Sequence, residues 1–265
     1  MNVRAPIVYI PHGGGPLPLM GDPGHERLVS FLQNLPNTLE TPDAILIISA
    51  HWETDVPTVT GGDAPGLLYD YAGFPPEAYT IQYPAPGAPV LADHIVARLD
   101  AAGFPARHDD RRGFDHGVFI PLKLMYPAAT IPCVQLSLLR SLDPAAHLRL
   151  GQALCALPQQ NILIVGSGFS FHNLRAFFQH DSQAAKESAA FQDWLAETCT
   201  SPDLPRTERE HRLRHWEQAP AARYCHPRAE HLLPLHVCFG MAGNIPAEVV
   251  FRDDVIDIPV IGLLW

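Results

Sequence analysis

The 265-residue sequence has few cysteines, no long apolar run and no cluster of basic residues. Its five cysteines are widely spaced and form no Cys-x-x-Cys pair, which argues against a disulfide framework and a thiolate zinc site. No apolar window reaches the length of a membrane-spanning helix. The formal charge of −10, without a basic stripe, argues against nucleic acid or an anionic membrane as the partner. We therefore expect a small-molecule partner and a reducing, cytoplasmic location.

The composition is that of a folded protein with a large core. Hydrophobic residues make up 47% of the chain, and the mean hydropathy is close to zero. A chain of this length can bury one large core, whereas two small domains would need a linker between them. We expect residues 1–265 to form a single catalytic domain. The sequence makes no prediction about the oligomeric state.

Apolar runs alternate with helical patterns along the first part of the chain. The runs that are rich in β-branched residues and bounded by Pro, Asp or Gly predict buried strands at residues 6–10, 44–50, 131–138 and 161–166. Leucine and isoleucine recur on one helical face in residues 88–102 and 143–157. This alternation predicts an α/β fold with a central mixed, mostly parallel sheet that is flanked by helices.

The last third of the chain is mostly helical in pattern. Helices are expected around residues 191–195, 207–216 and 231–243, the last despite Pro234, and a closing strand pair at 249–254 and 260–265. The stretch from Gly61 to Gly87 is different, because glycine and proline punctuate its aromatic residues too densely for a long helix or a central strand. It is either a lid or binding loop, or a rigid surface excursion packed on its own aromatics.

Four histidines follow strand-like apolar runs at the point where each run breaks into a turn or loop: His12, His51, His116 and His172. Side chains at the carboxyl ends of buried strands point into the crevice where open α/β sheets bind ligands. Three glycines follow His12 and allow a sharp turn, which leaves its imidazole facing a cavity. Two imidazoles from neighbouring strand ends can bind one divalent ion at about 2.0–2.2 Å. We therefore expect a metal centre that includes His12 and His51.

A catalytic metal needs a third ligand. The segment HPRAEHLLPLH offers four candidates, namely His226, Glu230, His231 and His236. A carboxylate would complete the facial triad of non-haem iron oxygenases, whereas a third imidazole would suit zinc equally well. The spacing alone does not choose between Glu230 and His231.

The remaining two histidines are candidates for proton transfer. His172 lies in a glycine-rich loop after a buried strand and could act as a general base, since the usual pKa of histidine is near 6.5. His116 is the candidate partner acid, and we expect Asp115 to set its tautomer. Other chemistries are less well supported, because the sequence has neither the G-x-S-x-G order of a nucleophile elbow nor a phosphate-binding GxxxxGK[ST] loop.

Seven ordered segments together resemble one known family: PHGGGP, SAHWE, AGFPPEAYTIQYPAPG, GFDHGVFIPLKLMYP, IPCVQLSL, GSGFSFHNLR and PRAEHLLPL. They are similar to the class III extradiol ring-cleavage dioxygenases of the 4,5-DOPA dioxygenase type, within the LigB-like superfamily. The resemblance runs from about residue 6 to about residue 262. It implies an oxidoreductase that adds both atoms of O₂ to DOPA or a related catechol and yields a ring-opened semialdehyde.

The resemblance also implies roles for individual residues. One divalent metal ion would be held by His12, His51 and His231, with Fe(II) expected for activity and Zn(II) compatible with the same site. His172 matches the base of the superfamily, which lies near enough in zinc-loaded members to count as a fourth ligand, and His116 matches the other active-site histidine. Glu230 is kept as a group that supports the ligands.

One departure from the family pattern bears on the substrate. Many relatives carry a histidine before an aspartate and an aromatic residue, where this chain has Tyr69, Asp70 and Tyr71. DOPA itself is therefore left open as the substrate. Arg175 and His180 lie beyond the base, where a substrate carboxylate could be met.

Two alternative functions remain at this point. A zinc-dependent hydrolase would use the same imidazoles and a histidine base to activate water. Memo-type members of the superfamily keep similar histidines but are described mainly as binding proteins. The segments AGFP, YPAPG and EHLLPL favour the DOPA type.

Overall fold

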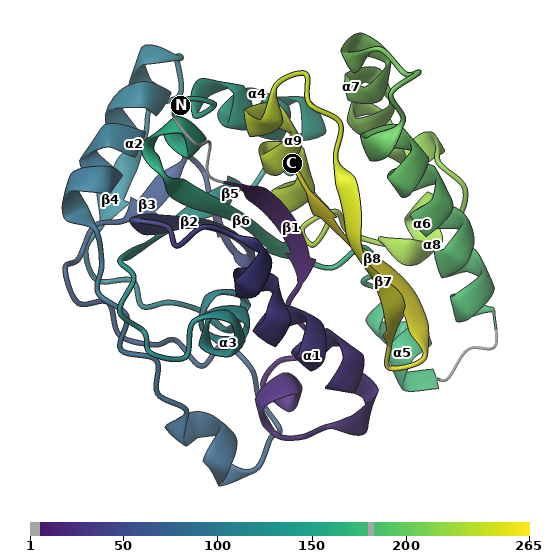
Figure 1. Ribbon diagram of the computed structural model, residues 1–265, viewed down its shortest axis with the longest axis horizontal. Coiled ribbons are helices and arrows are strands. Elements are labelled where there is room, and N and C mark those ends of the chain that lie inside the picture. Colours follow the sequence, from purple (N-terminus) through teal and green to yellow (C-terminus); the bar gives the residue numbers. More distant parts are fainter. Residues whose placement is uncertain (1–5, 180–182) are drawn as a thin grey trace.

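The computed structural model describes residues 6–179 and 183–265, and its strands form one mixed sheet (Figure 1). The strand order is β4-β3-β5-β2-β6-β1-β8-β7. The strands are β1 (Ile7–Pro11), β2 (Ala44–Thr54), β3 (Thr58–Thr60), β4 (Arg107–Asp109), β5 (Cys133–Leu139), β6 (Ile162–Gly168), β7 (Glu248–Val255) and β8 (Ile258–Leu264). The predicted α/β fold with a mixed, mostly parallel sheet is confirmed.

The centre of the sheet is parallel and fully covered. β5, β2, β6 and β1 pair in parallel, whereas β8 runs antiparallel to β1, and β7 runs antiparallel to β8. Every residue of β1, β5 and β6 is buried, as expected for parallel strands with helices on both faces. The short strands β3 and β4 were not predicted, because three residues carry too little pattern to recognise.

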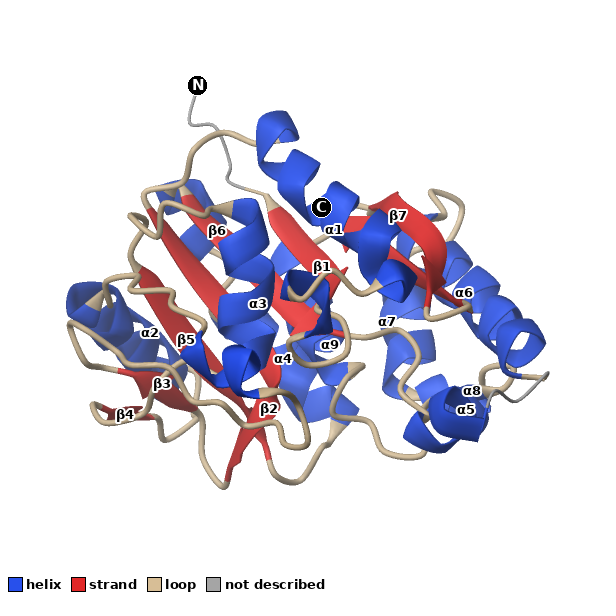
Figure 2. Ribbon diagram, turned by 90° about the horizontal axis from the view of Figure 1, so that it is seen from below, coloured by secondary structure: helices blue, strands red, loops and turns tan. Residues whose placement is uncertain are grey.

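Helices cover both faces of the sheet. Figure 1 shows α1 and α3 on one side and α2, α4 and α9 on the other, and Figure 2 shows α3 lying across the face of the central strands. The helices are α1 (Glu26–Asn34), α2 (Pro89–Ala101), α3 (His116–Met125), α4 (Pro144–Ala153), α5 (Leu174–Gln179), α6 (Ala184–Thr200), α7 (Arg206–Arg214), α8 (Ala222–Cys225) and α9 (Leu233–Ala242). Among the described helices, none is both long and apolar enough to cross a membrane.

Two of the four histidines that were predicted to lie at strand ends lie elsewhere in the structure. His51 lies within β2, which continues to Thr54, although the pairing of β2 with β5 shifts register between Ile48 and Glu53. His116 follows no strand at all but is the first residue of α3. That helix was missed because it is apolar on all sides and contains Pro121, so it has no amphipathic period.

Candidate active site

Five histidines line one cavity of about 370 Å³ at the carboxyl ends of the central strands: His12, His51, His116, His172 and His231. His12 directly follows β1, His172 lies in the loop after β6, and His231 lies just before α9. The ring centroids of His12, His51 and His231 are 4.9–5.3 Å apart. The structure therefore brings together every residue that the sequence assigned to metal binding or proton transfer.

The glycine turn after β1 aims His12 into the cavity. Gly13 has φ of +84°, a backbone conformation that suits glycine. The amide of Gly14 donates to Nε2 of the buried His25 at 2.9 Å, while Nδ1 of His25 lies 2.7 Å from Asp22 Oδ1. His25 thus supports the turn from outside the cavity. His25 lies outside the strand-end pattern, so sequence reasoning missed this role.

Hydrogen bonds fix the tautomers of two imidazoles. The hydroxyl of Ser167 donates to the carbonyl of Gly117, so it must accept from Nδ1 of His12, which lies 2.9 Å away. Nδ1 of His231 lies 3.0 Å from Oε1 of Glu230, which can only accept when ionised. In both rings Nε2 is therefore the unprotonated nitrogen, as a metal ligand requires.

Asp70, rather than Asp115, holds His116. Oδ1 of Asp70 accepts from Nδ1 of His116 at 2.8 Å and from its backbone amide at 3.0 Å. The prediction that Asp115 sets this tautomer was wrong. Asp115 is fully buried and instead accepts from Ser49 Oγ at 2.7 Å, and it also contacts Gln135 and Arg112 behind the cavity.

The donor set fits a divalent metal ion. Nε2 of His12 lies 3.1 Å from Nε2 of His51, and two nitrogens bound to one ion at about 2.1 Å lie about 3.0–3.4 Å apart. Burial lowers the pKa of His12, His51 and His231 well below the usual value, and repulsion from neighbouring imidazoles lowers it further. Neutral imidazoles are the form that binds metals.

Two sets of three residues lie close enough to hold one ion. The ligand atoms of His12, His51 and His116 all lie within 4.8 Å of one another, and the same is true of those of His172, Glu230 and His231. Of the ligands predicted from the sequence, His12 and His51 belong to the first set and His231 belongs to the second. The two sets face the same cavity, since all five histidines line it.

Glu230 contacts two of these imidazoles. Its Oε1 lies 3.2 Å from Nδ1 of His172 and 3.0 Å from Nδ1 of His231, and the two rings stack with centroids 3.3 Å apart. Burial raises the pKa of Glu230, but the hydrogen bond from His172 and the charge of Arg228 outweigh burial and hold it below its usual value. The ionised carboxylate therefore orients both rings.

The other two candidates for third ligand lie outside the cavity. Nε2 of the buried His226 lies 3.0 Å from the carbonyl of Ser170. His236 is buried between two backbone carbonyls, those of Leu213 at 2.9 Å and Leu232 at 3.3 Å. Of the two residues proposed to meet a substrate carboxylate, Arg175 is exposed and does not line the cavity, and His180 lies outside the described residues.

The rest of the cavity is apolar. Besides the five histidines and three glycines, its lining consists of eight aliphatic or aromatic side chains, which we call the apolar wall: Leu17, Tyr71, Ala72, Phe74, Phe169, Leu174, Phe177 and Ile256. The hydroxyl of Tyr71 donates to the carbonyl of Ala78. The loop of residues 61–87 supplies three of them. It also packs on its own aromatics, with Tyr71 beside Phe74 and Tyr79. The loop is therefore packed on its own aromatics and also lines the cavity, and its role as a binding loop stays a prediction.

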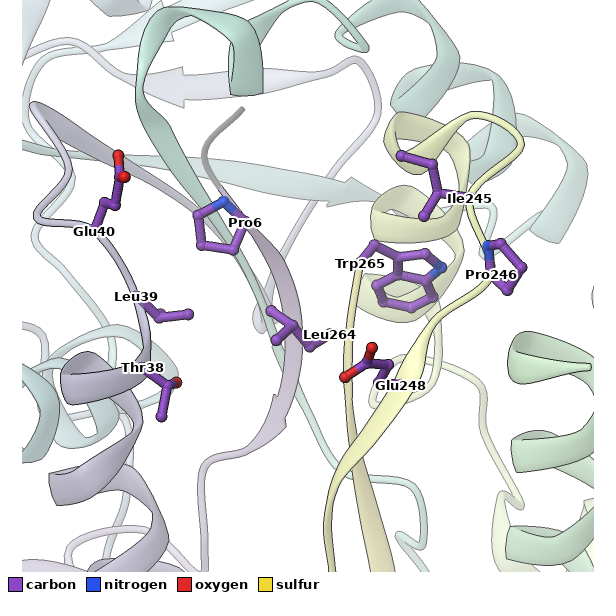
Figure 3. A pocket seen from close by; sticks show the side chains of 9 residues that line it. All are labelled: Pro6, Thr38, Leu39, Glu40, Ile245, Pro246, Glu248, Leu264 and Trp265. Atoms are coloured by element: carbon purple, nitrogen blue, oxygen red, sulfur yellow. The ribbon is translucent and has the colours of Figure 1, made fainter. Parts of the chain in front are cut away.

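A second cavity, of about 340 Å³, lies at the opposite end of the sheet (Figure 3). Pro6, at the start of β1, and Leu264 and Trp265, at the end of β8, line it together with Glu40 and Glu248. None of its described lining residues is a histidine, cysteine, lysine or arginine. Among the described residues, the two groups that could hold a metal ion both include histidines that line the histidine cavity.

The chain is similar to known proteins along most of its length. Residues 7–256 match the family model of the catalytic LigB subunit of aromatic ring-opening dioxygenase. Dioxygenase tasH of Hapsidospora irregularis is 41% identical, over 98% of this chain and 85% of that protein. The 4,5-DOPA dioxygenase extradiol of Beta vulgaris is 39% identical, over 91% of this chain and 89% of that protein.

A solved structure shows the same fold. The crystal structure of an uncharacterised protein from Escherichia coli K12 superposes with a TM-score of 0.80 at 31% identity, and the match covers 98% of this chain and 99% of that one. The resemblance that the seven sequence segments indicated is confirmed. This chain belongs to the LigB family of aromatic ring-opening dioxygenases.

Proposed function

We propose that the protein is a metal-dependent extradiol dioxygenase that opens the ring of a catechol with both atoms of O₂, with residues 1–265 acting as one catalytic domain. The observation that carries the proposal is the pair of facing nitrogens, His12 Nε2 and His51 Nε2, 3.1 Å apart in a cavity that His231 also lines. We assign one divalent ion to these three imidazoles. A ferrous ion held there would supply electron transfer between catechol and dioxygen, and zinc would fit the same nitrogens.

The two remaining histidines are placed to move protons. Glu230 accepts from Nδ1 of His172, which leaves Nε2 of that ring to take a phenolic proton from the bound catechol. Asp70 holds Nδ1 of His116 in the same way, so its Nε2 is the atom that exchanges a proton in the cavity. The stacking of His172 on His231 also makes it the fourth nitrogen available to a zinc ion.

The test is oxygen consumption by protein loaded with Fe(II) under anaerobic conditions. Anaerobic loading matters because zinc outcompetes ferrous iron at nitrogen-rich sites. We expect O₂ uptake and a yellow semialdehyde with at least one member of a panel that contains DOPA, protocatechuate, caffeate and 4-alkylcatechols. Neither oxygen uptake nor a chromophore with any of them, in protein that holds one equivalent of iron, would refute the proposal.

Two variants separate the metal ligand from the base. His231→Gln is expected to lose bound metal, because one of three nitrogens is removed. His172→Gln is expected to keep about one equivalent of iron while turnover falls by about 10²-fold or more. The exposed His215→Gln serves as the control and should change neither quantity. Equal loss of metal in both site variants would instead make His172 an obligatory ligand.

A further inference from the structure

The histidine cavity contains no charged side chain that could recognise an amino-acid substrate. Among the described residues that line it, none is Asp, Glu, Lys or Arg. At neutral pH the side chain of DOPA carries a carboxylate and an ammonium group. Burying such charges without partners costs several kcal/mol. The lining therefore disfavours this substituent.

Three charged groups close to the histidines of the cavity are already paired. Arg228 contacts both carboxylate oxygens of Glu53 at 2.6 Å and lies 3.3 Å from Glu230. Asp70 is bonded to His116, and neither Asp70 nor Glu230 lines the cavity. To pair with one of these three groups, a charged substituent would have to break an existing pair.

Helix α5 presents apolar side chains to the cavity and turns its arginine away. Leu174 and Phe177 both line the cavity, since residues three apart share one face of a helix. Arg175 lies about 100° around the helix from Leu174 and is exposed. The cation nearest to the apolar wall on this helix is thus directed to solvent.

The turn between β7 and β8 adds a strained apolar residue to the same wall. Ile256 and Asp257 both have positive φ, 51° and 61°, in a two-residue hairpin turn that favours Asn and Gly. A β-branched residue in this region is an outlier, and such strain persists where surrounding structure holds it, often at a ligand site. Ile256 lines the cavity, and its amide donates to the carbonyl of Gly24 at 3.0 Å.

On the basis of the ring-cleavage function proposed above, we propose that the cavity takes a catechol whose ring substituent is uncharged and apolar, and that Ile256 is a specificity-determining residue for that substituent. Ile256, Leu174 and Phe177 supply aliphatic and aromatic surface from two separate elements. Their contribution scales with the apolar area of the substituent that they remove from water.

The test is equilibrium binding to the Fe(II)-loaded protein without oxygen, repeated with zinc, so that no turnover takes place. The three ligands 4-propylcatechol, 3-(3,4-dihydroxyphenyl)propionate and DOPA carry chains of three carbons and differ in charge. We expect 4-propylcatechol to bind on the order of tenfold more tightly than either charged ligand, and about tenfold more tightly than 4-methylcatechol. Binding of DOPA as tight as that of 4-propylcatechol would overturn the proposal.

Two variants of the hairpin turn test the role of Ile256. Ile256→Gly is expected to weaken the binding of 4-propylcatechol by about three- to tenfold, whereas the affinity for unsubstituted catechol should change less than about twofold. Asp257→Gly relaxes the same turn at an exposed position outside the cavity. It should leave the dissociation constants of 4-propylcatechol and catechol unchanged. Both variants should melt within about 4 °C of the parent, because relief of strain opposes the added chain flexibility. An unchanged preference for the propyl chain in Ile256→Gly would contradict the assignment.

The outcomes also separate this inference from the function on which it rests. If charged catechols bind best and are opened with O₂ uptake, the ring-cleavage function stands and the apolar preference is wrong. If Arg175→Ala or His180→Ala removes DOPA binding, a charged group recognises the substrate, and the preference is again wrong. If no catechol binds and no oxygen is consumed, the ring-cleavage function itself fails.

Discussion

Asp70 decides which nitrogen of His116 carries a proton. Burial raises the pKa of its carboxyl, but the hydrogen bonds from His116 and the charges of His116 and His51 outweigh burial and hold the pKa at about 2. Asp70→Asn is expected to lower kcat by about 10- to 100-fold with little change in bound metal, as is usual when a partner of a site histidine is lost. Turnover and metal content measure this.

The pH dependence and a control complete that prediction. Because the pKa of Asp70 is depressed, its contribution is present above the usual carboxyl value and is lost only as the pH falls toward 2. The defect of Asp70→Asn should therefore be the same from pH 6 to 9. Asp63→Asn changes another aspartate of the same loop and should behave like the parent. A normal kcat for Asp70→Asn would show that Asp70 does not position His116.

At this scale the sequence predicted the imidazoles but not their partners. His12, His51 and His172 were recognisable because each follows an apolar run at a break in pattern. Adjacency in the chain favours Asp115 as the partner of His116. The real partner depends on how the loop of residues 61–87 folds back, and no local pattern encodes this.

The glycine turn after β1 is an element that is sensitive to a small change. In Gly13→Ala the new methyl group would overlap the side chain of Pro18 and lie 3.0 Å from Cδ2 of His25, in addition to the cost of positive φ. We expect a loss of more than about 2 kcal/mol in the free energy of unfolding and weaker metal binding. Gly21 also has a positive φ, of 73°, but no atom lies within 4 Å of the position that an added Cβ would take. Gly21→Ala should therefore lose only about 1 kcal/mol in the free energy of unfolding.

Denaturant unfolding and metal titration of the two variants measure the difference between them. Equal losses would show that the contact with Pro18 and His25 does not matter.

Among the elements, the long central strands and the helices with one apolar face were predictable. The short β3 and β4 and the all-apolar α3 were not, because only tertiary packing makes them visible.

Buried histidines that do not line the cavity make the stability of the whole molecule depend on pH. Burial lowers the pKa of His147 to about 4 and that of His226 to about 3, and it also lowers that of His236. In the unfolded chain these groups bind protons below about pH 6.5, whereas in the folded chain they stay neutral. Stability is therefore full above pH 6.5 and falls as the pH drops.

For metal-free protein we expect the free energy of unfolding to fall by about 1 kcal/mol per pH unit for each such histidine as the pH drops from 6.5 to about 4. Urea unfolding at several pH values measures the slope. His147→Gln should flatten it, since the amide can keep the hydrogen bond from the amide of Leu139 without titrating. A slope unchanged by this variant would mean that His147 already titrates normally in the folded state.

The bridge between Glu53 and Arg228 joins parts of the chain that are made far apart in time. Glu53 lies two residues beyond His51, and Arg228 lies three residues before His231. A nascent chain that has completed β1 and β2 can present only His12 and His51, and it has no third imidazole to close the site. If His12, His51 and His231 hold the ion as proposed above, this set of three imidazoles is complete only after the C-terminal part has left the ribosome and docked, so loading of this set would report completed folding.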